Sequence, residues 1–358
     1  MSEKYVYVFH HTDLDGMGIK IMGLLYAMQK GLPCRTCACS YASVNANVCQ
    51  AIKNTADVEE IIIGDISVNE DTAERLEDVY RDGTPVRLRD HHDSADWLNK
   101  YEWARVKEYD DGGISRCGTW WLAQDEDMKG VADKIPLIIN AIDEWDTWRW
   151  KNSGDDTAKN LNSLLSILGQ DDFVNWVMSS YKTFDTVENM FGEEEKIMLW
   201  TYHRQLQYQV EMCEKFMYTM NLWTEIPMHK DGVQRKLKKT IKLVTGIVFS
   251  NTDLSAIGDM ILDRHPELDI LMVIAFPGTI SWRTQKDLPI SLAKIAKRAT
   301  GKGGGHPSAA GSTIGFTAFK DMLIRFMDST FSTSLDFSNL KSSWERKNDM
   351  EQRQLAKG

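Results

Sequence analysis

Side chains that can bind metal ions and move protons are concentrated in a few short segments of this chain. Only 8 histidines occur, and five of them lie in three segments: His10, His11, His91, His92 and His306. Aspartates stand beside the first four of these histidines. Imidazole nitrogens and carboxylate oxygens together suit Mn²⁺, Mg²⁺ or Zn²⁺. We therefore take these segments as the candidate chemical centre.

The first segment, HTDLDG, has a spacing that brings three such groups together. His11, Asp13 and Asp15 alternate, so on an extended strand end they project to one side. The alternative is an ordinary loop before a helix, in which an aspartate caps the helix N-terminus. That alternative explains one carboxylate and leaves the other groups unexplained.

Two further segments follow short apolar runs. Asp65 follows the apolar run in IIIGDIS and precedes Ser67, which could equally be the N-cap of the next helix. The triplet Asp90, His91 and His92 is harder to explain structurally, because two adjacent histidines cannot both point into the core. A carboxylate beside them can fix the tautomer of an imidazole.

Alternating strands and helices are predicted to position these segments. Tyr5–Phe9, Glu60–Gly64 and Pro85–Leu88 have the composition of short strands, whereas 17–30 and 69–81 are predicted to be helical. This alternation indicates a parallel sheet, and ligand sites of such sheets lie beyond the carboxyl ends of the strands. We therefore expect the three polar segments to converge in one crevice.

The rest of the chain predicts a long helix and a second, smaller α/β domain. A helix-like stretch over 135–150 contains Asp143 and Asp146, and one amphipathic helix of unusual length is expected between Gly192 and Trp223. Beyond it, strands are predicted over 242–250, 269–276 and 279–283, around a helix at 254–263. The last residues are polar and without clear periodicity.

The ordered motifs HTDLDG, GDIS, DHH and IDEWDTW resemble the four N-terminal motifs of the DHH phosphoesterase superfamily. SWR at 281–283 and GGGHPSAAG at 303–311 resemble its C-terminal DHH-associated domain, so the resemblance covers both halves. It implies an α/β protein with a parallel-sheet catalytic domain, a helical connector, a smaller α/β substrate domain and a polar tail. The expected boundaries are 1–175, 176–225, 226–340 and 341–358.

The resemblance also implies two divalent cations, most often Mn²⁺, with Mg²⁺ or Co²⁺ as alternatives. One would be held by His11, Asp13 and Asp65. The other would be held by Asp15, Asp65, His91 and an aspartate of the fourth motif, so that Asp65 bridges. Asp146 is favoured for the last position by its DTW context, and Asp143 remains open. His11 is preferred to His10 because of its spacing to Asp13.

Such a pair of cations can lower the pKa of a shared water and neutralise charge on a phosphate. We expect a hydrolase in which metal-activated hydroxide attacks phosphorus. His92 is not needed as a ligand and is the candidate proton donor to a phosphate oxygen or leaving group, with Asp90 beside it. The product would be a phosphomonoester or a nucleotide.

The C-terminal motif predicts contacts to the substrate. Gly303, Gly304 and Gly305 would let backbone N–H groups approach a phosphate, and His306 adds a ring for contact or stacking. Arg283 can bind a phosphate through two nitrogens. A flexible glycine loop is the structural alternative. The spacing is not that of a Walker loop, so an ATPase is not expected.

Composition restricts the partners and the location. With 42 Lys and Arg against 52 Asp and Glu, the net charge is -10, which gives no support for general attachment to long nucleic acids. The longest apolar run, Ile270–Phe276, is far shorter than the ~18 residues of a membrane span, and no secretion leader is expected after Met1. We expect a cytoplasmic protein without membrane attachment, with a homodimer as one option.

The 6 cysteines leave two interpretations. Cys34, Cys37 and Cys39 have a spacing that thiolate zinc sites use, but no second pair completes a tetrahedral set. Buried, reduced thiols are the default.

Several activities fit this pattern. Hydrolysis of short oligonucleotides to nucleoside monophosphates, as in nanoRNases, ranks first, followed by hydrolysis of cyclic mono- or dinucleotides and then of pyrophosphate. A RecJ-like single-strand exonuclease is less favoured, because such enzymes generally add a further oligonucleotide-binding domain. The non-enzymatic alternative is an inactive nucleotide-binding scaffold, which the full set of candidate ligands disfavours.

Overall fold

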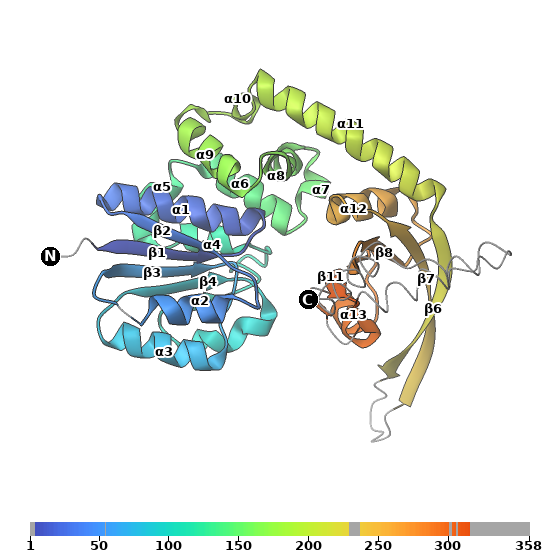
Figure 1. The fold of residues 1–358 in the computed structure, drawn as a ribbon, viewed down its shortest axis with the longest axis horizontal. Coiled ribbons are helices and arrows are strands. Elements are labelled where there is room, and N and C mark those ends of the chain that lie inside the picture. Colours follow the sequence, from blue (N-terminus) through green and yellow to red (C-terminus); the bar gives the residue numbers. More distant parts are fainter. Residues whose placement is uncertain (1–3, 54, 229–236, 301–302, 306, 316–358) are drawn as a thin grey trace, which may run out of the picture. The chain divides into compact units, whose positions relative to one another are not determined.

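A five-stranded sheet, parallel throughout, forms the centre of the N-terminal part of the chain (Figure 1). The computed structural model describes residues 4–53, 55–228, 237–300, 303–305 and 307–315. The sheet order is β2-β1-β3-β4-β5. Its strands are β1 (Tyr5–His10), β2 (Cys34–Ala38), β3 (Val58–Gly64), β4 (Val86–Asp90) and β5 (Ala104–Val106). The three strands predicted from the sequence correspond to β1, β3 and β4 and are confirmed.

Helices cover both faces of this sheet, which is why the central strands are apolar on both sides. Along β1, Val6 and Val8 belong to one core cluster, whereas Tyr5 and Phe9 belong to the other. The first cluster includes α1 (Leu14–Lys30), α4 (Gly118–Ala123), α6 (Pro136–Asp146), α8 (Thr157–Leu168) and α9 (Gln170–Ser180). The second includes α2 (Val44–Ala51), α3 (Glu70–Arg81) and the 3₁₀ helix η1 (Asp93–Lys100).

Local signals place the helix starts next to the strand ends. Asp13 caps α1 by accepting a hydrogen bond from the Gly16 N–H, and Asn69 caps α3 in the same way through the Thr72 N–H. Gly31 ends α1 in the left-handed conformation, with φ 69°. The cap of α3 is therefore Asn69, and the suggestion of Ser67 as an N-cap is wrong.

Short helical segments connect the main helices of this part. They are η2 (Glu126–Met128), α5 (Lys129–Ala132), α7 (Trp150–Ser153), η3 (Tyr181–Thr183) and α10 (Val187–Met190). The long helix α11 (Glu193–Lys215) follows them. It is shorter than predicted, because 218–228 form a strand instead of continuing the helix. The expected helical connector over 176–225 is therefore wrong in its last residues.

The C-terminal part has its own sheet, of order β10-β11-β9-β8-β7-β6. Only β7 and β8 pair in parallel, and the other neighbours are antiparallel. Its strands are β6 (Tyr218–Met228), β7 (Leu237–Phe249), β8 (Ile270–Ala275), β9 (Thr279–Arg283), β10 (Gly303–Gly305) and β11 (Ala309–Thr313). Its helices are α12 (Leu254–Arg264) and α13 (Leu292–Thr300). The mixed α/β character of both parts agrees with the predicted fold class.

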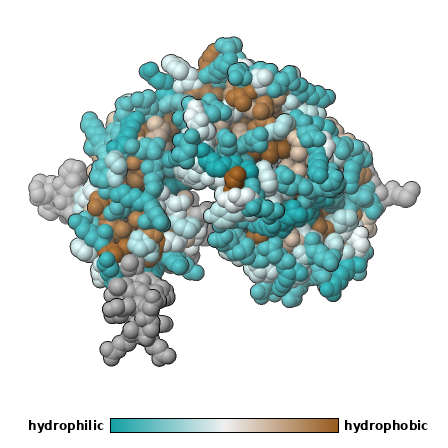
Figure 2. All heavy atoms as spheres, turned by 180° about the vertical axis from the view of Figure 1, so that it is seen from behind, coloured by the Kyte–Doolittle hydropathy of each residue, from teal (hydrophilic) through white to brown (hydrophobic). Residues whose placement is uncertain are grey.

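The chain divides into two compact units, Met1–Arg204 and Gln205–Gly358, and the division falls within α11. The catalytic and substrate-binding roles expected for 1–175 and 226–340 stay predictions. The predicted polar tail at 341–358 lies outside the described residues. No helix of the described part is long and apolar enough to cross a membrane. The face in Figure 2 is mostly hydrophilic, with hydrophobic side chains in small patches.

Candidate metal centre

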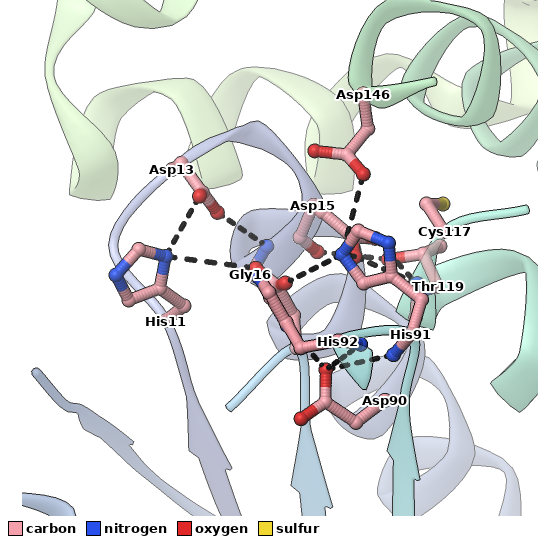
Figure 3. Close-up of polar contacts among 12 residues, drawn as sticks. His11, Asp13, Asp15, Gly16, Asp90, His91, His92, Cys117, Thr119 and Asp146 are labelled. Carbon is pink, nitrogen blue, oxygen red and sulfur yellow. Dashed lines mark hydrogen bonds and ion pairs between the residues drawn. The ribbon is translucent and has the colours of Figure 1, made fainter. Parts of the chain in front are cut away.

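The three polar segments meet at the carboxyl edge of the parallel sheet (Figure 3). β1, β3 and β4 run in the same direction, so the residues that follow them lie at one edge. Three groups of side chains there have ligand atoms within 4.8 Å of one another. The groups are His11, Asp13 and Asp65; Asp15, His91 and Asp146; and Asp65, Asp90, His91 and His92. The predicted convergence is therefore present in the structure.

His11 and Asp13 lie on the loop between β1 and α1. Asp13 Oδ2 accepts a hydrogen bond from His11 Nδ1 at 2.7 Å, and its Oδ1 accepts one from the Gly16 N–H at 3.1 Å. Asp13 thus has both roles considered from the sequence, as helix cap and as partner of His11. A Cβ on Gly16 would lie 2.1 Å from the His11 carbonyl oxygen, so only glycine allows this tight loop.

Asp65 lies between two histidines from different loops. Its Oδ2 is 3.7 Å from His11 Nδ1, and its Oδ1 is 3.4 Å from His91 Nε2. The residue is buried and has a left-handed backbone, with φ 54°. This conformation is uncommon outside glycine, and such residues gather at functional sites.

The second group combines Asp15, His91 and Asp146 from three elements. His91 Nε2 lies 3.4 Å from Asp146 Oδ2 and 4.0 Å from Asp15 Oδ2. Asp15 is buried in the first turn of α1, and its two oxygens accept hydrogen bonds from the Gly118 and Thr119 N–H groups at 2.7 and 2.8 Å. The start of α4 therefore fixes the Asp15 carboxylate.

The third group contains the DHH triplet. Asp90 is fully buried, and its Oδ1 accepts hydrogen bonds from the His91 N–H and from His92 Nδ1, both at 2.7 Å. Its Oδ2 accepts a hydrogen bond from the Ser67 hydroxyl. Because Asp90 binds Nδ1 of His92, the opposite ring nitrogen of His92 is directed away from this carboxylate. Asp90 orients the histidine.

Asp143 is not brought to any of these groups, in contrast to its neighbour Asp146. Its Oδ2 accepts hydrogen bonds from Arg116 and Arg149 at 2.7 and 2.5 Å, and its Oδ1 accepts one from the Cys117 N–H at 2.9 Å. The carboxylate is buried and already neutralised by two guanidinium groups. Its geometry favours Asp146 for the fourth motif.

His10 also lies outside these groups. It is buried, and its Nδ1 is 2.7 Å from the His11 carbonyl oxygen. Burial lowers its pKa to about 4, so it is a neutral core histidine at ordinary pH.

The crowded carboxylates change the proton affinity of the site. Burial raises the pKa of Asp65 well above its ordinary value, and the charges of Asp13 and Asp15 add to this rise. Burial likewise raises the pKa of Asp146 to about 7. Burial opposes the charge on His91, but the surrounding carboxylates, Asp146 first, outweigh it and raise its pKa to about 9. The negative charges at this edge exceed what the nearby side chains neutralise.

Two carboxylate oxygens test whether a cation fits here. Asp65 Oδ2 and Asp146 Oδ2 are buried and have no hydrogen-bond donor within the described part of the chain. Buried anionic oxygens without donors are costly, and a divalent cation stabilises them. The donor set of imidazole nitrogens and carboxylate oxygens suits Mn²⁺ or Mg²⁺. The residues fit a divalent-metal site, as predicted.

In the described part of the chain, the cysteine thiols supply no ligand atom to these groups. All six are free thiols, and the metal-capable groups among the described residues contain none of them.

In the second unit, Arg283 and Gly303–Gly305 make hydrogen bonds within the unit that the sequence did not predict. Arg283 ends β9, and its guanidinium donates hydrogen bonds to the hydroxyls of Ser281, at 3.3 Å, and Ser255. Gly303–Gly305 form the edge strand β10, paired with β11, and the loop interpretation is wrong for them. His306 lies outside the described residues. The role of all these residues as substrate contacts stays a prediction.

Comparison with known proteins finds an oligoribonuclease as a relative. No family model matches the chain. Oligoribonuclease NrnB of Bacillus subtilis (strain 168) is 28% identical over 325 residues, which cover 86% of this chain and 72% of that protein. The chain is thus similar to an oligoribonuclease over most of its length.

Solved structures of RecJ align with most of this chain. Exonuclease RecJ bound to manganese aligns with a TM-score of 0.45 and 14% identity, covering 91% of this chain and 90% of that one. RecJ of Thermus thermophilus in complex with Mn²⁺ aligns with a TM-score of 0.42 and 13% identity, covering 91% and 52%.

Several residues that shape the candidate metal centre were not identified from the sequence. Gly118 and Thr119 bind Asp15 through backbone groups, which no residue pattern reveals. Arg116 and Arg149 neutralise Asp143 from separate loops. Tyr41, after β2, has its ring centroid 5.9 Å from that of His11 and 6.1 Å from that of His92.

Proposed function

We propose that this chain is a divalent-metal-dependent phosphodiesterase that hydrolyses short oligonucleotides to nucleoside monophosphates. The observation that carries the proposal is the position of Asp65, between His11 and His91, with a buried oxygen that has no donor among the described residues. A carboxylate in that position suits a bridge between two cations. The similarity to an oligoribonuclease supports the choice of substrate.

In this proposal two ligand sets that share Asp65 would hold two divalent cations. His11 and Asp13 would complete one set, and Asp15, His91 and Asp146 would complete the other. Bound there, two divalent cations would supply an activated water nucleophile and neutralise charge on the scissile phosphate. Mn²⁺ is the favoured ion, with Mg²⁺ or Co²⁺ as alternatives.

The chain's own residues orient the reaction. The Gly118 and Thr119 N–H groups hold Asp15 in one orientation, so this ligand needs little reorganisation when a cation binds. Asp90 holds Nδ1 of His92, which leaves Nε2 as the nitrogen able to donate a proton to an oxygen of the substrate. We assign His92 as proton donor and Asp90 as its positioning residue.

The second unit contains the candidate substrate contacts. We infer that the Arg283 guanidinium and the backbone of 303–305 contact phosphate groups, together with His306. The support is chemical: guanidinium and exposed backbone N–H groups are strong phosphate donors. A cytoplasmic location and a homodimer are inferred from sequence composition and family resemblance only.

The test is hydrolysis of a substrate panel by the purified chain. The panel contains 5′-phosphorylated RNAs of two to ten nucleotides, cyclic mono- and dinucleotides and pyrophosphate, each with Mn²⁺ and with EDTA. Asp65→Asn is the inactive variant, and Asp78→Asn, an exposed carboxylate on α3, is the matched control. We expect turnover of the shortest RNAs, only with metal, and lost only in Asp65→Asn.

Other outcomes redirect the assignment. Preference for a cyclic dinucleotide would replace the substrate class and keep the chemistry. Equal turnover by Asp65→Asn and the unchanged protein would overturn the proposed centre.

A further inference from the structure

Tyr41 is an aromatic residue held at the carboxyl edge of the sheet without a core environment. It follows β2, so it lies on the same edge as the loops after β1, β3 and β4. Its side chain is 55% exposed, and it belongs to none of the hydrophobic clusters of the described chain. Its ring neighbours there are two histidines of the candidate site, His11 and His92.

The backbone around Tyr41 is anchored. The Ser43 and Val44 N–H groups each donate a hydrogen bond to the Ser40 carbonyl at 2.9 Å, and the Ser40 N–H donates to the Ser43 hydroxyl oxygen at the same distance. Before the turn, the Cys39 N–H donates to the His10 carbonyl at 2.8 Å. Tyr41 therefore lies on a hydrogen-bonded turn, and Cys39, which precedes the turn, is hydrogen-bonded to His10, next to His11.

The orientation of the ring leaves a surface open beside the reacting groups. The Tyr41 and His92 rings are almost perpendicular, at 88°. Within the described residues, the phenol hydroxyl makes no hydrogen bond that would explain why a tyrosine is placed here. An exposed aromatic ring on an anchored turn offers stacking area at a small entropic cost.

We propose that Tyr41 is a substrate-positioning residue, on whose ring the base next to the scissile phosphate stacks. This inference rests on the proposed function, because it requires a nucleotide substrate. Stacking of a base on an aromatic side chain strengthens binding by about tenfold or more and depends little on sequence. For a substrate of two or three nucleotides, one such contact is a large part of the binding energy. It would place the phosphate against His92.

The experiment measures kcat and KM of Tyr41→Ala, Tyr41→Phe and Tyr41→Trp on a 5′-phosphorylated dinucleotide. The same dinucleotide with an abasic position in place of one base or the other is the second substrate set. Tyr80→Ala is the matched control, because Tyr80 lies near the end of α3, at the opposite edge of the sheet. Thermal unfolding of each variant reports whether it is folded.

We expect Tyr41→Ala to raise KM about tenfold or more with a smaller effect on kcat. Phe and Trp should retain most of the affinity, because they keep the ring. With one of the two abasic dinucleotides, Tyr41→Ala and the unchanged protein should have the same KM, because the base that stacks on Tyr41 is missing.

Three results would overturn the inference while leaving the proposed function intact. The first is an unchanged KM in Tyr41→Ala. The second is an equal rise of KM in Tyr41→Phe and Tyr41→Ala, which would assign the effect to the hydroxyl. The third is a fall in kcat alone, which would mean that the ring supports His92. Absence of any dinucleotide turnover by the unchanged protein would overturn both proposals.

Discussion

His92 Nδ1 lies 2.7 Å from Oδ1 of Asp90, a carboxylate that is fully buried behind it. The same oxygen accepts the His91 N–H, so one carboxylate sets the direction of two neighbouring residues. The interaction with His92 lowers the pKa of Asp90 to about 2 although burial opposes its charge, so it is ionised at neutral pH. Asp90 is thus an anionic partner that fixes the ring of His92.

Asp90→Asn therefore removes the orientation of His92 and keeps the size of the side chain. We expect kcat to fall about 10²- to 10³-fold, with a small change in Mn²⁺ affinity, because Asp90 is not assigned as a ligand. The kcat of His92→Ala should fall by a similar factor, and the kcat of the double variant should be no lower than that of either single variant. Calorimetric titration with Mn²⁺ and steady-state kinetics separate the two effects. Additive losses would mean that Asp90 and His92 act independently.

Asp65→Asn should lower the activity of the chain and raise its stability in the absence of metal. Burial and the neighbouring carboxylates disfavour the charge of Asp65, and its left-handed backbone suits asparagine. In EDTA at pH 8, the melting temperature should rise by a few degrees, equivalent to about 1 kcal/mol or more. Activity with Mn²⁺ should fall by at least about 10³-fold. A destabilised, active variant would contradict this assignment.

Asp143 and Asp146 provide a comparison within one helix. Asp143→Asn leaves Arg116 and Arg149 without their buried carboxylate, so it should cost about 3 kcal/mol of unfolding free energy. Asp146→Asn should leave stability in EDTA unchanged or raised, and should weaken Mn²⁺ binding. Urea unfolding and metal titration measure both quantities. The reverse pattern would assign Asp143 as the ligand.

Stability should depend on pH in opposite ways with and without metal. The pKa of His91 is raised from 6.5 to about 9, so between these values the folded chain binds a proton that the unfolded chain has lost. Unfolding free energy in EDTA should therefore decrease from pH 7 to pH 9. Bound metal requires deprotonated ligands, so the stabilisation by Mn²⁺ should increase over the same range. In His91→Asn the slope in EDTA should become smaller.

Two glycines of β10 should respond differently to alanine. A Cβ on Gly304 would meet no atom within 4 Å, whereas on Gly305, at φ 134°, it would lie 2.5 Å from the Ala309 carbonyl oxygen. Gly305→Ala should lower the melting temperature of the second unit. Gly304→Ala should leave it unchanged and raise KM if this backbone contacts phosphate. An unchanged KM would remove 303–305 from the substrate site.

The sequence allowed the sheet edge and its three polar segments to be predicted, because each is a buried apolar strand followed at once by charged residues. Parallel pairing then brings the strand ends together whatever their separation along the chain. The start of β6 is harder to predict from the sequence. Met217 and Met220 continue the helical spacing of α11, although 218–228 pair with β7. A short window of apolar residues fits both periods.

The motif IDEWDTW favours Asp146 through its DTW context but does not exclude Asp143. The difference arises from Arg116 and Arg149, which reach Asp143 from outside that motif. Likewise, Tyr41 has no motif around it, and only the closeness of β2 to β1 brings it near His11. Such relations depend on tertiary packing, which local patterns do not contain.

The short segment between Arg116 and Thr119 divides three successive N–H groups between two carboxylates. The Cys117 N–H binds Asp143, and the next two bind Asp15. Inserting or deleting one residue here would shift all three donors by a position and release both carboxylates together. This segment therefore tolerates no insertion or deletion of a single residue, and natural or engineered changes of chain length should avoid it.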